Sequence, residues 1–149
     1  MLWCHGGGFD SGTSAWNPGM GLAKKDVVVV SLNHRLNIIG FLDLSATGNP
    51  KYKESGNVGM LDVLAALRWI HDNIAAFGGD PENITVFGES VGGTLVDCLM
   101  SDKTTEGLFQ HAISQSGPHV LMFAQHHYDE NKQKKQRKDS AFAYGAGLC

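Results

Sequence analysis

Four consecutive valines at positions 27–30 constrain the fold of this chain more than any other feature of its sequence. They lie in the segment 26–32, DVVVVSL, in which β-branched residues follow one another without alternating with polar ones. Such a run is typical of a strand that is buried on both faces of a parallel sheet. The sequence therefore predicts a buried parallel strand over 26–32. Because the run is too short to span a bilayer, we also expect a soluble protein without a membrane-spanning segment.

Strand-like and helix-like segments alternate along the rest of the chain. The strand candidates lie at 1–4, 84–87 and 111–115, and the predicted helices lie at 18–25, 57–77 and 91–100. This alternation is typical of α/β architecture, in which helices flank a mainly parallel sheet and ligands lie at the carboxyl ends of the strands. Glycine-rich turns follow the candidates at 1–4 and 84–87, so we expect both turns at that edge of the sheet.

The segment 57–77 carries the clearest helical pattern. Its apolar residues recur at helical spacing in one stripe, formed by Met60, Leu64, Leu67 and Ile74 and broadened by Leu61 and Ala65. Gly78 and Gly79 end the pattern, and Asp80-Pro81 supplies a turn. We therefore expect one long helix that packs this stripe on a face of the sheet.

Composition argues against several classes of function. A formal net charge of −3 over 149 residues offers no electrostatic basis for binding nucleic acid or an anionic membrane. Cys4, Cys98 and Cys149 are too few and too irregular for a disulfide framework or a metal site, so we interpret them as reduced buried or terminal thiols. The first residues, MLWCHGGG, lack the basic and apolar regions of a signal peptide. Neither a metal nor a cofactor is expected, and the compartment and oligomeric state stay open.

Residues 125–140, QHHYDENKQKKQRKDS, differ in composition from the rest of the chain. They are polar and lysine-rich, with almost no apolar residue. Because their charges are mixed in sign, we predict a solvated helix or loop rather than a nucleic-acid or membrane patch.

Residues 88–92, GESVG, match the pattern G-x-S-x-G. In so tight a strand-to-helix turn, side chains two positions either side of the serine would collide, and the serine takes a strained conformation that exposes its hydroxyl. The pentapeptide alone is a weak signal. Its position between the predicted strand 84–87 and the predicted helix 91–100 makes Ser90 a candidate nucleophile rather than an ordinary capping serine.

Residues 5–9, HGGGF, form a second glycine motif. Backbone N–H groups in such a loop stabilise the negative oxygen of an acyl-transfer intermediate. A Walker-type phosphate loop would end in Gly-Lys-Ser/Thr and a dinucleotide loop would read G-x-G-x-x-G, and neither pattern is formed here. The two motifs together favour a serine hydrolase, and a flexible glycine turn is the alternative for the second motif.

Four stretches carry a resemblance to a known family. They are HGGGFDSG, DVVVVSLNHRLNIIGFL, GNVGMLDVLAALRWIHDNIAAFGGDPENITVFGESVGG and GLFQHAISQSG, and they run almost continuously from residue 3 to about 117. In them the chain resembles the type-B carboxylesterase and cholinesterase-like family of the α/β-hydrolase fold. The family's domain runs to several hundred residues. The resemblance therefore implies that 1–149 is the N-terminal part of one such domain, a partial fold that stops after the nucleophile region. Residues 125–149 would be a polar tail leading into the remainder.

The resemblance also implies roles for individual residues. Ser90 would be the nucleophile, and the amides of Gly7, Gly8 and Val91 would form the oxyanion hole. Glu89, beside the nucleophile, would support the site. We interpret it as a buried carboxylate satisfied by hydrogen bonds.

Two further expectations concern charge and departures from the family pattern. The resemblance suggests that Arg35 and Asp62 pair, since unpaired charge at the end of a buried strand and near the start of the long helix would be costly. Val91 stands where alanine is commoner in the family, and Val63 stands where glutamine is frequent.

The predicted function is hydrolysis of small-molecule carboxylic esters through an acyl-enzyme on Ser90. An amidase or acyltransferase would use the same serine. Alternatives from other classes are a non-catalytic cholinesterase-like scaffold or adhesion protein, in which the serine is typically lost, and an inactive truncated remnant. The catalytic acid and histidine would lie outside this chain, because the histidines after Ser90 stand in a strand pattern or in the wrong order relative to an acid. We therefore expect the chain alone to be inactive.

Overall fold

A four-stranded parallel sheet organises the molecule. The computed structural model describes residues 1–117, and its strand order is β2-β1-β3-β4. The strands are β1 (Leu2–Cys4), β2 (Val30–Ser31), β3 (Thr85–Glu89) and β4 (His111–Gln115). Every neighbouring pair is parallel, which confirms the predicted α/β class with a mainly parallel sheet.

Short and long helices connect these strands. The α-helices are α1 (Met20–Ala23), α2 (Asn37–Phe41), α3 (Val58–Asn73) and α4 (Val91–Ser101). The 3-10 segments are Ser14–Trp16, Ser45–Thr47, Pro50–Tyr52, Ser55–Asn57, Ile74–Phe77 and Lys103–Thr105. The helices predicted at 18–25, 57–77 and 91–100 are confirmed as α1, as α3 with its 3-10 extension, and as α4. Helix α2 was not predicted.

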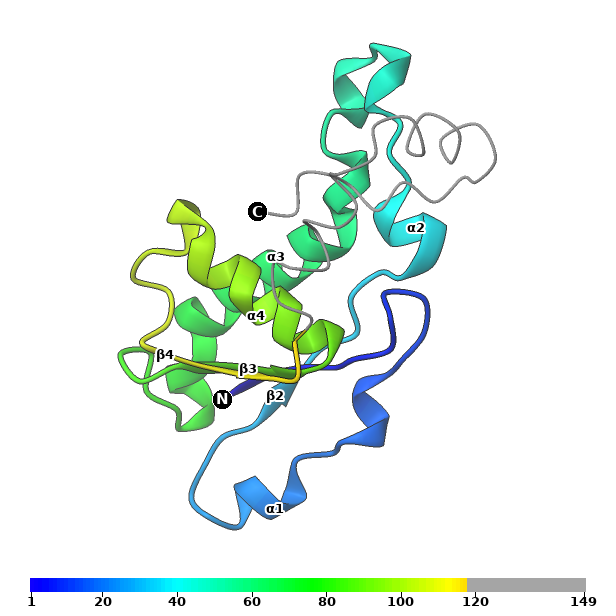
Figure 1. Ribbon diagram of the computed structural model, residues 1–149. Helices are drawn as coiled ribbons and strands as arrows, with labels where there is room; N and C mark the ends of the chain where they lie inside the picture. Colours follow the sequence, from blue (N-terminus) through cyan, green and yellow to red (C-terminus); the bar gives the residue numbers. More distant parts are fainter. Residues whose placement is uncertain (118–149) are drawn as a thin grey trace.

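The helices cover the two faces of the sheet unequally. Helices α3 and α4 lie on one face, while the short α1 lies on the other (Figure 1). On the α1 side, Trp3 and Phe87 line a hollow of about 390 Å³ together with Trp16 and Met20, which are exposed. Within residues 1–117 the main core therefore lies between the sheet and the pair α3 and α4.

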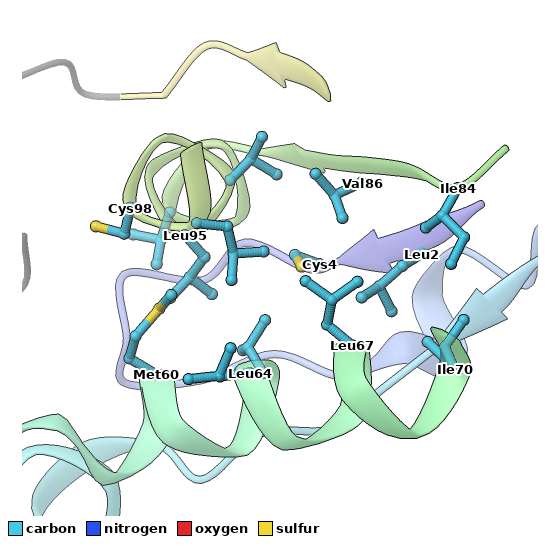
Figure 2. Close-up of a cluster of buried hydrophobic side chains, with 14 of the residues drawn as sticks. Leu2, Cys4, Met60, Leu64, Leu67, Ile70, Ile84, Val86, Leu95 and Cys98 are labelled. Carbon is cyan, nitrogen blue, oxygen red and sulfur yellow. The ribbon is translucent and has the colours of Figure 1, made fainter. Parts of the chain in front are cut away.

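Residues at alternate positions of β1 and β3 form the part of this core that the sheet contributes. Leu2 and Cys4 of β1 and Val86 of β3 are fully buried and point toward α3 (Figure 2). From α3, Leu64 and Leu67 point back at them (Figure 2). Full burial of an aliphatic side chain of this kind contributes about 1.5–3 kcal/mol, so this layer stabilises the sheet against both helices.

The predicted stripe on α3 is partly wrong. Leu61 is 40% exposed and Ala65 is exposed too, whereas Val63 and Ile70 are buried. A helix turns through about 100° per residue, so the position after Met60 points away from the sheet, while the position three residues on returns to it. The buried stripe therefore extends toward Val63 and Ile70.

The burial predicted for the valine run is also wrong. Residues 27–30 are only half-buried, and the strand itself covers only Val30–Ser31. The reason is that β2 lies at the edge of the described sheet, where β1 is its only neighbouring strand. It is held there by the amino terminus of Met1, which donates to Val28 O at 2.7 Å, and by the Val30 amide, which donates to Met1 O at 2.9 Å.

The second predicted buried strand is buried on one side only. Ile84 and Val86 are buried, whereas Thr85 and Phe87 are half-buried because they face away from α3 and α4. The strand also begins at Thr85 and runs to Glu89, two residues beyond the predicted end.

Cys4 and Cys98 are buried, as interpreted. Cys149 and the polar segment 125–140 lie outside the described residues. In the part of the chain that the structure describes, no helix is both long enough and apolar enough to cross a membrane.

The predicted pair of Arg35 and Asp62 is confirmed. The guanidinium donates from Nη2 to Asp62 Oδ1 at 2.6 Å and from Nε to Oδ2 at 2.8 Å, and the Arg35 amide donates to Oδ2 at 2.9 Å. These bonds tie the segment after β2 to the first turns of α3. The side-chain hydrogen bond from Arg35 is the largest cause that holds the pKa of Asp62 below its usual 3.8.

We expect Asp62→Asn to lower the thermal midpoint of unfolding at pH 7 by about 5 °C, because a charge-assisted, partly buried bidentate pair is lost. Since the folded-state pKa of Asp62 is depressed, the stabilisation is present above pH 3.8 and is lost as the pH falls below it. Thermal melts of both proteins followed by circular dichroism at pH 7 and at pH 3 check this.

The matched control is Asp72→Asn, which removes an exposed carboxylate near the other end of α3. A negative charge near a helix carboxyl end is unfavourable, so this control is expected to leave the midpoint unchanged or slightly raised. Equal midpoints for wild type and Asp62→Asn at pH 7 would show that the pair does not stabilise the fold.

Candidate active site

Ser90 occupies the turn between β3 and α4. Its backbone has φ 55° and ψ −123°, a conformation that L side chains rarely adopt and that costs about 1–3 kcal/mol. The Ser90 amide donates to Gln115 O of β4 at 2.9 Å, and its carbonyl accepts from the Thr94 amide at 3.2 Å. Helix α4 begins at the next residue, as predicted. The neighbouring strand and the first turn of the helix thus hold a strained serine in place.

The glycines on either side of Ser90 allow this turn to pack against β1. A Cβ on Gly92 would overlap the carbonyl oxygen of Cys4, and a Cβ on Gly88 would overlap the backbone of Gly92. The same atom on Gly88 would lie 2.8 Å from Cys4 O. The expected crowding is therefore confirmed, and it involves the last residue of β1 as well as the turn itself.

The glycine loop after β1 lies directly against Ser90. A Cβ on Gly6 would lie 2.8 Å from Glu89 O and 3.1 Å from Ser90 Cβ, so only glycine allows this approach. The loop then turns back on itself, because the amides of Asp10 and Ser11 donate to Gly7 O at 3.1 and 3.0 Å. Both glycine turns therefore lie at the carboxyl edge of the sheet.

Several amides near this edge have no hydrogen-bond acceptor within residues 1–117. Those of Gly7, Gly8 and Val91 are among them. The amide of Val91 belongs to the first turn of α4, where N–H groups lack partners inside the helix and the helix dipole favours negative charge. Gly8 has a φ of 68°, and a Cβ there would meet no atom of residues 1–117 within 4 Å.

The interpretation of Glu89 as a buried carboxylate is wrong. Glu89 is exposed at the end of β3. It shares a face of the strand with Thr85 and Phe87, and this is the face that α3 and α4 do not cover. Its Oε2 lies 3.0 Å from the position of a Cβ on Gly6, so the side chain does lie beside the glycine loop.

His5 and His34 form a buried stacked pair next to this loop. Only 1% of His5 and 4% of His34 is exposed, and their ring centroids lie 4.6 Å apart with planes 24° from parallel. Nδ1 of His5 lies 2.7 Å from Gly6 O. Because a carbonyl oxygen only accepts, we assign the proton of His5 to Nδ1. Burial, followed by the electrostatic effect of the neighbouring His5, lowers the pKa of His34 to about 4.

Sequence reasoning did not find this pair. His5 was noted only as the first residue of a glycine motif, and His34 only within a matching stretch. The two residues are far apart in the sequence, and no periodic pattern connects them. The available signal was the position of each histidine just beyond a strand candidate, since parallel strands end at the same edge of a sheet.

The other described histidines lie away from Ser90. His111 begins β4 and pairs with Thr85, so it stands at the amino end of the strands, about 13 Å along the strand axis from the opposite edge. His71 lies in the last turns of α3 beside Asp72. Within residues 1–117, no histidine or carboxylate is hydrogen-bonded to the Ser90 hydroxyl.

Known proteins share both the sequence and the fold of this chain. The profile of the carboxylesterase family matches residues 1–145. The para-nitrobenzyl esterase of Bacillus subtilis (strain 168) is 49% identical over 120 residues, which make up 78% of this chain and 24% of that protein. Neuroligin-2 of Mus musculus is 49% identical over 118 residues, which make up 78% of this chain and 14% of that protein.

Solved esterases have the same arrangement of strands and helices. A carboxylesterase of Geobacillus stearothermophilus superposes with a TM-score of 0.73 at 49% identity, over 75% of this chain and 25% of that one. An esterase of Clostridium hathewayi superposes with a TM-score of 0.70 at 50% identity, over 76% of this chain and 23% of that one. The chain thus spans about a quarter of the length of the esterases that it matches.

We expect Gly92→Ala to lower the free energy of unfolding by about 3 kcal/mol or more, because the new methyl group would overlap the main chain of β1 rather than a movable side chain. Urea denaturation measures this change. The matched control is Gly21→Ala in α1, where a Cβ would meet no atom of the described residues within 4 Å. It is expected to change stability by less than about 1 kcal/mol. Similar values for the two variants would contradict the close approach of Gly92 and Cys4.

Proposed function

Since the chain belongs to the carboxylesterase family, we propose that the protein hydrolyses carboxylic esters through an acyl-enzyme formed on Ser90. Residues 1–149 would be the N-terminal part of one carboxylesterase domain, and its substrates would be small-molecule esters. The observation that carries the proposal is the backbone of Ser90, whose φ of 55° at the first turn of α4 lifts the hydroxyl out of a crowded turn.

The reaction begins with Ser90 Oγ attacking the carbonyl carbon of the ester. A tetrahedral intermediate forms, the bond to the alkoxy oxygen breaks, and the alcohol leaves while the acyl group stays on Ser90. Water then attacks this acyl-enzyme, so the acid is released and the serine is restored. Each half-reaction passes through a negatively charged oxygen that needs hydrogen-bond donors.

We assign these donors to the amides of Gly7, Gly8 and Val91. All three lack acceptors within residues 1–117, and the loop that carries the first two begins against Ser90. The partial positive charge at the start of α4 adds to the stabilisation that the Val91 amide provides. Loss of a single donor of this kind costs about 10²–10³-fold in kcat in serine hydrolases.

We propose that the general base lies outside this chain. His5 and His34 are enclosed in their stack, and His111 stands at the wrong end of β4. Glu89 lies beside the glycine loop, and we propose that it supports the site through this contact rather than as a buried carboxylate.

A second candidate function is that of a non-catalytic binding protein. The observation that favours it is the match to neuroligin-2, whose name states no esterase activity, at the same 49% identity as the bacterial esterase. The intact serine motif and the strained conformation of Ser90 favour the hydrolase, because backbone strain persists where a site uses it.

A chimera tests the role of Ser90 in a complete enzyme. Residues 1–117 would replace the matching segment of the Bacillus subtilis para-nitrobenzyl esterase. We expect this chimera to hydrolyse p-nitrophenyl acetate, and Ser90→Ala within it to lower kcat by about 10⁴-fold or more. The control Ser101→Ala changes the last residue of α4, whose hydroxyl donates to Asp97 O, and it is expected to keep full activity. A folded chimera whose hydrolysis does not depend on Ser90 would overturn the assignment.

We expect the 149-residue chain by itself not to turn over esters. Without an imidazole to accept its proton, a serine hydroxyl is a poor nucleophile at neutral pH. Release of p-nitrophenol by the chain should equal that of its Ser90→Ala variant, and a fluorophosphonate should label it only slowly. Rapid, stoichiometric labelling that depends on Ser90, together with turnover at about 1 per second or faster, would show that the chain contains its own base.

A further inference from the structure

The stacked pair of His5 and His34 has no role in the proposed chemistry, yet it lies between the glycine loop and the rest of the fold. His5 contacts both ends of the loop. Its Nδ1 bonds Gly6 O at 2.7 Å, and a Cβ on Gly12 would lie 2.5 Å from Nδ1 and 2.7 Å from Cε1. The loop 6–12 therefore closes around the ring of His5.

The segment that contains His34 is held by α3. His34 precedes Arg35, whose amide and guanidinium both bond Asp62 of α3. Two residues further on, the Asn37 amide donates to Phe9 O at 2.7 Å, within the glycine loop. The segment 34–37 thus contacts the loop directly through Asn37 and indirectly through the stack of His34 on His5, while it is anchored to α3.

We propose that His5 and His34 are positioning residues whose stacked rings hold the glycine loop 6–12 in place against Ser90. This inference rests on the proposed role of that loop as the oxyanion hole. The ring of His34 supplies a flat apolar face, and neither of its nitrogens has a partner within residues 1–117. Its contribution is therefore packing, whereas His5 adds a hydrogen bond.

The pair makes the loop sensitive to acid. A proton added to the unprotonated nitrogen of His34 would stand in a buried position without an acceptor within residues 1–117, which is costly. The groups around His34 act on its pKa in opposite directions. His5 and burial disfavour its charged form, while Asp62 favours it and is itself neutralised by Arg35.

The direction of the pH dependence follows from the lowered pKa of His34. Above pH 6.5 the ring is neutral in both the folded and the unfolded chain, so the loop is fully held. As the pH falls from 6.5 toward about 4, the unfolded or opened form binds the proton more readily than the closed form, and the loop opens.

Hydrogen exchange on the 149-residue chain tests the proposal. The reporters are the amide of Ser11, which donates to Gly7 O inside the loop, and the amide of Asn37, which donates to Phe9 O of the loop. The reference is the amide of Asp102, which donates to Cys98 O at the end of α4. We expect His34→Ala to lower the protection factors of Ser11 and Asn37 by about tenfold or more while that of Asp102 stays within about twofold. The control His111→Ala, an exposed histidine on β4, should change none of them.

His34→Phe separates stacking from ionisation. It keeps an aromatic face and loses no hydrogen bond, so the protection of Ser11 and Asn37 at pH 7 should be retained within about twofold. In the wild type this protection should fall between pH 6.5 and 4, and His34→Phe should reduce that fall. If the role of His34 did not depend on its ring charge, the protection of Ser11 and Asn37 would fall with pH in His34→Phe as it does in the wild type.

Other outcomes overturn the proposal. Unchanged loop protection in His34→Ala, or equal losses in His34→Ala and His34→Phe, would show that the stack does not hold the loop. If His34→Ala fails to fold, nitrogen-15 titration of the wild-type rings decides, because a His34 pKa near 6.5 would contradict a closed uncharged stack. These measurements do not depend on ester hydrolysis. If the Ser90 chimera failed, they would still show whether the stack holds the loop.

Discussion

The close approach of the serine turn to the end of β1 is the contact on which the rest of the site depends. Gly92 lies so near Cys4 O that no side chain fits between them, and Gly88 is enclosed by the same two segments. Parallel pairing of β1 with β3 sets this approach, because the register places Cys4 opposite Gly88. Once both strands end at the same level, the glycine loop that follows Cys4 has to begin beside Ser90.

A second set of contacts fixes the loop from outside the sheet. Arg35 and Asp62 anchor the segment after β2 to α3. His34 belongs to this anchored segment and stacks on the ring of His5. The site is therefore supported from two directions, by the strand ends below and by the long helix through a charged pair. Oxyanion donors work only when they are held in place before the reaction, so this double support suits the proposed chemistry.

Most of the fold and the candidate nucleophile could be predicted from the sequence, and the errors share one cause. Helix α3 and the alternation of strands and helices in an α/β fold followed from periodicity, which reflects local geometry. The burial of the valine run and of Glu89 was wrong, because burial depends on what covers a residue. The valines form an edge strand in the described sheet, and Glu89 ends β3 on the face that α3 and α4 do not cover.

What the sequence by itself determined is local and steric. Glycines two positions either side of Ser90 make a tight strand-to-helix turn sterically possible, and in that turn the serine takes a strained conformation. Only the tertiary structure decided which segments meet there. It brought His34 onto His5, placed Gly6 against Ser90, and left Leu61 outside the core. The physical reason is that steric limits act between neighbours along the chain, whereas stacking, burial and the lowered pKa of His34 arise between residues that only folding brings into contact.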